Sequence, residues 1–304
     1  MPGPGSAPPA TPTTRRLADA LPQLHVTWAT AGAIAAVLIG VGSLLSVQLR
    51  RRQVGVAVRE IGIVLGLFGL WMFVGHLVGH HPAGGYQRGE EIWRAEQSLH
   101  IADEAAVQRP LLGHRWLVEA ANYYYAYAHW LSVDVVLAWL WLRHRARYVH
   151  ARATLVVFTG VCLCLHLISS APPRLLAQTH LVDTATLLGQ SVYGDTPGLS
   201  DHLSAMPSIH VGWAVLFAIA AWGTRSWTAR ILLSLHALLT AYVVVVTGNH
   251  FWLDGIVAAA IVAPAWVAVG VLRSHRFRQE ASSATRLPPE PHAPLTEPVA
   301  DCVP

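Results

Sequence analysis

Residues 206–210 read Met-Pro-Ser-Ile-His, residues 249–254 read Asn-His-Phe-Trp-Leu-Asp, and each stretch opens an apolar segment. Together they place two histidines and one aspartate at the ends of segments that are otherwise hydrophobic. Titratable side chains are costly in a membrane, and those that occur there usually serve a function. The two stretches therefore predict chemistry at a membrane surface.

The composition around these stretches is that of a membrane protein. Of 304 residues, 53% are hydrophobic and 12% are charged, about half the charge of an ordinary soluble domain. Crossing a bilayer takes roughly 20 apolar residues, and the absence of a polar face argues against a soluble bundle. The sequence thus predicts an all-α, polytopic transmembrane helical bundle of about six to seven spans. Its apolar segments cover about 27–48, 59–79, 116–142, 152–172, 207–223, 229–247 and 252–272.

The basic residues predict the orientation of the chain in the membrane. All of them are Arg, and they gather in the connections after the first, third, fifth and seventh segments. By the positive-inside rule these connections face the cytoplasm, so the N-terminus lies outside and the C-terminus inside. The net charge of +4 comes from these loops and does not indicate nucleic-acid binding. We expect a multi-pass protein of a bacterial plasma membrane.

The two ends of the chain are rich in Pro and are predicted to be disordered, over 1–25 and, on the cytoplasmic side, over 279–304. Residues 26–278 are predicted to form the transmembrane catalytic domain, whose first span is a retained anchor rather than a cleaved signal peptide. The long connection before the third span is predicted to hold an interfacial helix at about 88–110. A plain surface linker is the alternative.

His250 and Asp254 are spaced i, i+4, so a helix that begins here places them on one face, within reach of each other. A carboxylate that accepts one imidazole N–H fixes the tautomer and makes the other nitrogen the reactive one. Gly248 allows a tight turn before the pair, and Asn249 is a candidate helix cap. This is the arrangement expected of a nucleophilic histidine.

The start of the fifth segment is a candidate anion site. Pro207 suits the first helical position, and the helix dipole favours an anion beside the unbonded N–H groups. Ser208 adds a hydroxyl donor, His210 stands about one turn in, and Arg174 is held at the interface by two prolines. Phosphoryl transfer needs an oriented nucleophile, a proton donor and positive groups. These residues supply all three, so no metal and no cofactor is expected.

Other polar residues in the apolar segments are weaker candidates. His129 and His166 are embedded ionisable groups and candidate site-lining residues, whereas His236 is expected to be a packing residue. Three loop aspartates are expected to be solvated rather than to bind a head group: Asp183, Asp195 and Asp201. Three histidines close in sequence have no obvious fourth ligand, so a metal site is not favoured there: His76, His80 and His81.

These residues resemble the signatures of the type 2 phosphatidic acid phosphatase superfamily of membrane enzymes. AMPSIHVGWA at 205–214 is similar to the second signature of the branch that contains inositol phosphorylceramide synthase and sphingomyelin synthase. TGNHFWLDG at 247–255 is similar to the third, and APPR at 171–174 to part of the first. An N-x-x-Y-x-x-x-H pattern of bacterial members adds two candidate site-lining residues, Asn122 and Tyr125, to His129. The likeness covers roughly 115–272.

The resemblance implies a role for each residue. His250 would be the nucleophile, Asp254 its partner, His210 the proton donor to the leaving group and Arg174 the phosphate-binding arginine. The resemblance further implies a metal-independent enzyme. Its site would lie at the outer membrane face, and it would act on lipid phosphates or phosphodiesters in the bilayer.

Departures from the phosphatase pattern bear on the substrate. The chain has no Lys, and Val243 and Val244 stand where that pattern has Ser-Arg. A site with fewer cations favours a phosphodiester as substrate, because a phosphodiester carries only one negative charge. The sequence therefore favours an enzyme that transfers an inositol-phosphate type of group. The alternative enzyme is a polyprenyl or phosphatidate lipid phosphatase. Outside the enzymes, the alternatives are a lipid-phosphate transporter or scaffold of the same fold, and a lipid-binding sensor.

Overall fold

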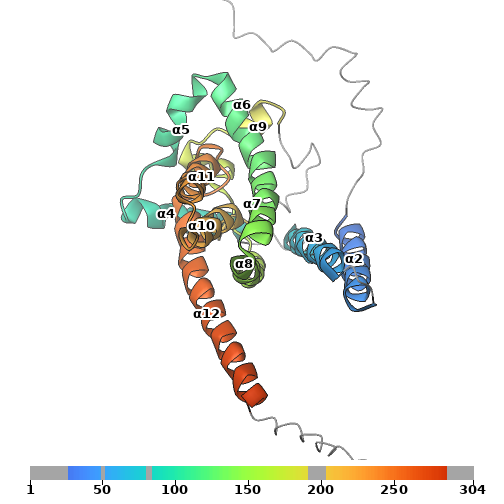
Figure 1. Ribbon diagram of the computed structural model, residues 1–304. Helices are drawn as coiled ribbons and strands as arrows, with labels where there is room; N and C mark the ends of the chain where they lie inside the picture. Colours follow the sequence, from blue (N-terminus) through green and yellow to red (C-terminus); the bar gives the residue numbers. More distant parts are fainter. Residues whose placement is uncertain (1–26, 49–51, 80–83, 191–202, 286–304) are drawn as a thin grey trace, which may run out of the picture. The chain divides into compact units, whose positions relative to one another are not determined.

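The computed structural model describes residues 27–48, 52–79, 84–190 and 203–285, and within these ranges the chain is helical, without a strand. This confirms the predicted all-α class. The elements, labelled as in Figure 1, are α2 (Trp28–Gln48), α3 (Arg52–Gly79), α4 (Gly85–Ser98), α5 (Glu104–Leu112), α6 (Arg115–Tyr123), η1 (Tyr124–Ala128), α7 (His129–Arg143), α8 (Arg145–His166), η2 (Pro173–Leu175), η3 (Ala177–Thr179), α9 (Thr184–Leu187), α10 (Ile209–Trp222), α11 (Trp227–Val246) and α12 (Trp252–Thr285).

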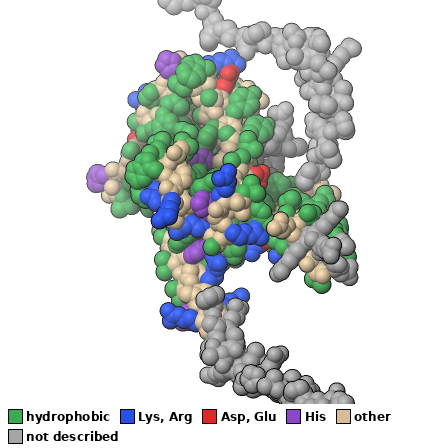
Figure 2. Space-filling view, in the orientation of Figure 1, with side chains coloured by type: hydrophobic (Ala, Val, Ile, Leu, Met, Phe, Trp, Pro, Cys, Tyr) green, Lys and Arg blue, Asp and Glu red, His purple; other side chains and the backbone are tan. Residues whose placement is uncertain are grey.

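Every predicted apolar segment corresponds to a helix of the structure. Five helices are long and apolar enough to cross a membrane: α2, α3, α8, α11 and α12. The third predicted segment is the run α6–η1–α7, which a π-helical turn interrupts, and the fifth is α10, with only 14 residues. Large apolar side chains remain exposed along these helices, and Figure 2 shows hydrophobic side chains on their outer surface. The protein is therefore a membrane protein.

The predicted interfacial helix and the predicted start of the C-terminal tail both differ from the structure. The single helix expected over about 88–110 is two helices, α4 and α5, because His100 adopts a left-handed backbone conformation (φ 54°) and Asp103 starts a new helix. The Asp103 side chain accepts the backbone N–H of Ala105 over 3.1 Å, which is a typical N-cap contact. Helix α12 runs to Thr285, past the predicted start of the tail at 279. The predicted disordered stretch 1–25 lies outside the described residues.

The helices fall into two compact units. The first comprises Met1–Glu91, Leu163–Pro172 and Tyr193–Ala205, and the second comprises Ile92–Cys162, Pro173–Val192 and Met206–Pro304. In the first unit α2 and α3 lie side by side (Figure 1). A Cβ at Gly42 would press on the backbone of Arg59, and one at Gly55 on that of Ser46. Small residues of this kind allow membrane helices to pack closely.

The second unit is built around α10. This helix lies beside α11 and also packs against α12 (Figure 1). Nine of its 14 residues are buried, and the Trp213 indole N–H donates to the Thr159 hydroxyl on α8 over 3.0 Å. Phe158 of α8 lies against Gly212, where a Cβ would overlap its ring. His210 is the second residue of α10, so the packing of this short, buried helix determines the position of His210.

The contact between Gly212 and Phe158 predicts that adding a single methyl group at position 212 lowers the stability of the protein. We expect Gly212→Ala to destabilise the protein by about 1–3 kcal/mol, because the ring of the fully buried Phe158 has little room to move. Gly160→Ala is the matched control on α8, since a Cβ there meets nothing within 4 Å and alanine favours a helix. Thermal unfolding in detergent would measure both, and equal midpoints for the two variants would contradict this packing.

Candidate active site

His250 and Asp254 lie together at the start of α12. The Nδ1 atom of His250 is 3.2 Å from Asp254 Oδ2, and both residues are buried. The same Oδ2 accepts the backbone N–H of Phe251 over 2.9 Å, as an acid at the third helical position often does. The structure thus contains the i, i+4 pair predicted from the spacing. The residue that caps the helix start is Asp254, not Asn249 as predicted.

Helix α10 begins two residues later than predicted. Ile209, not Pro207, is the first helical residue, and the side-chain oxygen of Ser208 before it accepts the N–H of Val211 over 3.4 Å. The Ser208 N–H donates to the Asp254 carbonyl over 3.1 Å, which joins the starts of α10 and α12. Ser208 is completely buried and acts as a cap. Phosphate binding by its hydroxyl stays a prediction.

His210 lies in a group of aromatic rings near His250. The centroids of the two imidazole rings are 6.1 Å apart. The ring of Tyr125 stacks on His210 at 4.5 Å, and the ring of His129 lies 4.8 Å from it. Tyr125 belongs to the π-helical turn η1, a local widening of the helix that is frequent at functional sites. Both Tyr125 and His129, predicted as site-lining residues, therefore adjoin His210.

His236, expected to be a packing residue, is hydrogen-bonded and lies beside this group. Its Nδ1 is 2.7 Å from the Tyr124 hydroxyl and its Nε2 is 3.1 Å from that of Ser132. Its ring stacks parallel to that of His129, with 5.7 Å between the centroids. His129 is almost fully buried, and neither of its ring nitrogens has a hydrogen-bond partner among the described residues. No spacing in the sequence connects His236 with these residues.

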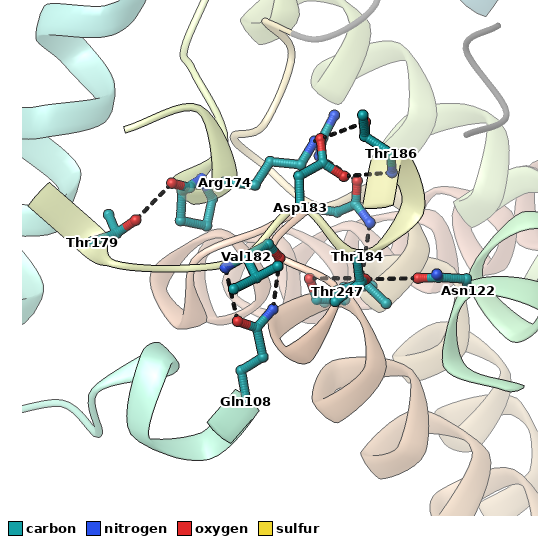
Figure 3. A network of polar contacts seen from close by, with 12 residues as sticks. Gln108, Asn122, Arg174, Thr179, Val182, Asp183, Thr184, Thr186 and Thr247 are labelled. Carbon is teal, nitrogen blue, oxygen red and sulfur yellow. Dashed lines mark hydrogen bonds and ion pairs between the residues drawn. The ribbon is translucent and has the colours of Figure 1, made fainter. Parts of the chain in front are cut away.

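Arg174 lies on the turn that leads into His250. Its backbone N–H donates to the Gly248 carbonyl over 3.1 Å, and its guanidinium donates to the side-chain oxygen of Asn249. Gly248 has a left-handed backbone (φ 70°), and a Cβ there would come within 2.9 Å of Arg174 Cβ. Asp183 Oδ2 is 3.5 Å from Arg174 Nε. Asp183, expected to be a solvated loop charge, is therefore the acidic partner of the predicted phosphate-binding arginine (Figure 3).

Two buried amides hold the loop that carries Asp183 (Figure 3). Asn122, predicted to line the site, donates to the Gln190 side chain over 2.9 Å and accepts the Thr184 hydroxyl over 3.0 Å. Gln108 donates to the carbonyls of Val182 and Val246, each over 2.9 Å. Asn122 thus supports the loop, and Gln108 is a residue that the sequence analysis missed. Nothing in the local sequence distinguishes Gln108 from an ordinary polar residue of a surface helix.

The remaining residues that the sequence singled out have the following places in the structure. His166 is buried at the end of α8, in a part of that helix that belongs to the first unit. Val243 and Val244 are buried in the apolar cluster that includes Tyr125. Among the described residues, no group of three or more His, Cys, Asp or Glu is placed to hold a metal. Four residues named above lie outside the described ranges: His80, His81, Asp195 and Asp201.

Comparison with known proteins identifies the family. A family model described as the PAP2 superfamily matches residues 90–268, which is more than half of the chain. The crystal structure of Aquifex aeolicus LpxE is similar at 18% identity and a TM-score of 0.41, over 55% of this chain and 91% of that one. No curated protein matches. The predicted enzyme class, a lipid phosphatase or phosphotransferase, agrees with the family match. The chain belongs to the PAP2 superfamily.

Proposed function

We propose that this protein is a metal-independent membrane enzyme that cleaves lipid phosphate esters through a phosphohistidine on His250. The observation that carries the proposal is the buried contact of 3.2 Å between His250 Nδ1 and Asp254 Oδ2. His210, whose ring centroid is 6.1 Å from that of His250, is the second titratable group of the pair. Arg174, bonded to the turn before His250, is the cation for the phosphate.

The reaction runs in two steps. With Nδ1–H directed to Asp254, the Nε2 atom of His250 attacks phosphorus, the N–P bond forms, and the bond to the leaving oxygen breaks. Protonated His210 gives its proton to that oxygen. In the second step water or an alcohol attacks phosphorus, passes its proton to His210, and the N–P bond breaks. Arg174 compensates the charge on the phosphoryl oxygens.

The acceptor in the second step decides the class of product. The finer proposal is transfer of an inositol-phosphate type of group. Two observations support it: the likeness of 205–214 and 247–255 to that branch, and the buried valines where phosphatases carry Ser-Arg. A phosphodiester carries less charge and needs fewer cations than a monoester. A polyprenyl or phosphatidate phosphatase is the alternative enzyme. We place the site at the outer face of a bacterial plasma membrane, as the Arg distribution predicts.

A transporter or scaffold that kept the fold without the chemistry is the alternative from another class. Intramembrane charges also mark transport paths. The pairing of His250 with Asp254 favours the enzyme, because a transport path has no need of an oriented nucleophile. The two classes differ in whether the loss of His250 abolishes turnover.

Replacing His250 is expected to abolish turnover. We expect His250→Ala to lose all detectable product, and Asp254→Asn to lose about 100-fold or more, because the imidazole then loses its orienting carboxylate. The measurement offers phosphatidic acid, polyprenyl diphosphate and phosphatidylinositol to purified protein in detergent, with and without alcohol acceptors, and identifies products by mass spectrometry. Exposed His114, whose side chain makes no capping bond, provides the control His114→Ala.

The products of the reaction distinguish a phosphatase from a phosphotransferase. Free phosphate that disappears in His250→Ala indicates a phosphatase, and a head group moved onto an alcohol indicates a phosphotransferase. Equal turnover by wild type and His250→Ala would contradict the proposed nucleophile. Turnover lost equally in His114→Ala would show that the assay reports protein quality rather than chemistry.

The pairing of Arg174 with Asp183 predicts a change in substrate affinity. We expect Asp183→Asn to lower KM for an anionic substrate by about threefold, because a carboxylate no longer competes with the phosphate for the guanidinium. Asparagine can still cap α9, as Asp183 does by accepting the Thr186 N–H. Asp103→Asn is the matched control, since Asp103 caps α5 in the same way without an ion pair to Arg174. A raised KM for Asp183→Asn would indicate that the acid positions Arg174 instead.

The proposed acid–base pair predicts the response to pH and to chelators. Activity should be bell-shaped in pH, because attack needs neutral His250 and protonated His210 together. A profile flat from about pH 5 to 9 would count against this pair. EDTA should leave the rate unchanged. A strong loss with EDTA that added Zn²⁺ or Mg²⁺ restores would instead point to a metal, with His76 and its neighbours the first residues to test.

A further inference from the structure

A buried carboxyl group lies behind the first turn of α12 and takes no part in the steps described above. Glu96, on α4, accepts the backbone N–H of Leu253 through Oε1 over 2.7 Å. Leu253 is the second residue of α12 and directly precedes Asp254. Only 1% of Glu96 is exposed, so this contact is removed from water. An acceptor at this position satisfies one of the N–H groups that a helix start leaves unbonded.

The neighbouring helix α5 supports the same turn. Gln108 of α5 donates to the carbonyl of Val246, the last residue of α11, while Glu96 binds the other side of the turn at Leu253. Glu104 lies one helical turn before Gln108, and both are buried. Helices α4 and α5, which stand in place of the single interfacial helix predicted at about 88–110, therefore hold the turn that carries His250 from both ends.

The two buried acids cannot both be ionised at low cost. Glu96 Oε2 and Glu104 Oε1 are buried and have no hydrogen-bond partner among the described residues. Burial above all, together with the neighbouring carboxyls of Glu104 and Asp254, raises the pKa of Glu96 to about 9. A proton on Glu96 would remove one of the negative charges near Asp254.

We propose that neutral Glu96 is a positioning residue that holds the first turn of α12, with Asp254 and His250, in its reactive geometry. The proposal rests on the function proposed above for His250. It assigns Glu96 no contact with the substrate. Its effect reaches the reaction only through the backbone of Leu253 and the orientation of Asp254.

The test compares Glu96→Gln with Glu96→Ala. Glutamine keeps a neutral oxygen acceptor for Leu253, whereas alanine removes it. With bis(para-nitrophenyl) phosphate and para-nitrophenyl phosphate as probes, we expect the Gln variant to keep kcat within about threefold. We expect the Ala variant to lose about tenfold in kcat with KM little changed, as for loss of a single cap. Glu91→Ala, an exposed acid on the same helix, is the matched control.

A second readout is independent of activity. Hydrogen exchange of the peptide covering 247–255 should be faster in Glu96→Ala and unchanged in Glu96→Gln, whether or not either probe is a substrate. If wild type turns over neither probe, the proposed function is in doubt, while the exchange result still decides the role of Glu96. Wild-type exchange and kcat in the Ala variant would overturn the proposal. Equal defects in the Gln and Ala variants would overturn it as well, because a neutral acceptor would then not suffice.

The dependence of stability on pH tests the proton on Glu96, even if the Ala variant does not fold. A carboxyl whose pKa is raised from 4.5 to about 9 binds its proton more tightly in the folded protein. Stability should therefore fall as the pH rises from about 5 to about 9, and Glu96→Gln should remove that component. The melting temperature of the Gln variant should rise relative to wild type across this range. A constant difference between the two proteins would show that Glu96 is ionised and would overturn the proposal.

Discussion

The buried carboxylate of Asp254 is the constraint on which the rest of the site depends. An acid withdrawn from water needs hydrogen-bond donors, and Asp254 Oδ2 obtains them from His250 Nδ1 and the N–H of Phe251, whereas Oδ1 has none among the described residues. Its carbonyl also accepts the N–H of Ser208, at the start of α10. One residue therefore contacts the imidazole, caps the start of α12 and ties α12 to the helix that carries His210. A shift of Asp254 would therefore move the His250 imidazole, the start of α12 and the start of α10.

Polar side chains near Asp254 form hydrogen bonds that hold the backbone of the turn before His250. Arg174 is bonded to the Gly248 carbonyl and to Asn249, so the loop after α8 lies against the turn before His250. Gln108 and Asn122 fasten the same loop from α5 and α6. Irregular backbone near a membrane must find its hydrogen bonds within the protein, and these amides supply them. The polar residues of the second unit thus support the turn that carries His250.

Sequence reasoning succeeded where a feature repeats over many residues or lies within one helical turn. The apolar segments could be read from composition, and the pairing of His250 with Asp254 from their i, i+4 spacing. It failed where a polar residue meets a partner far along the chain. Glu96 contacts Leu253 across 157 positions, and His236 contacts Tyr124 across 112. A single sequence contains no local signal for such pairs.

The sequence by itself determined the all-α membrane fold, the order of the apolar segments and the i, i+4 pairing of His250 with Asp254, because hydrophobic length and helical periodicity are local properties. Tertiary structure alone decided which residues support this pair. It made Ser208 a helix cap, gave Asp183 to Arg174 as an ion-pair partner, and buried Glu96 beneath the first turn of α12. The physical reason is that a buried polar group can bond only to the groups that the fold brings near it, and only packing decides which groups those are.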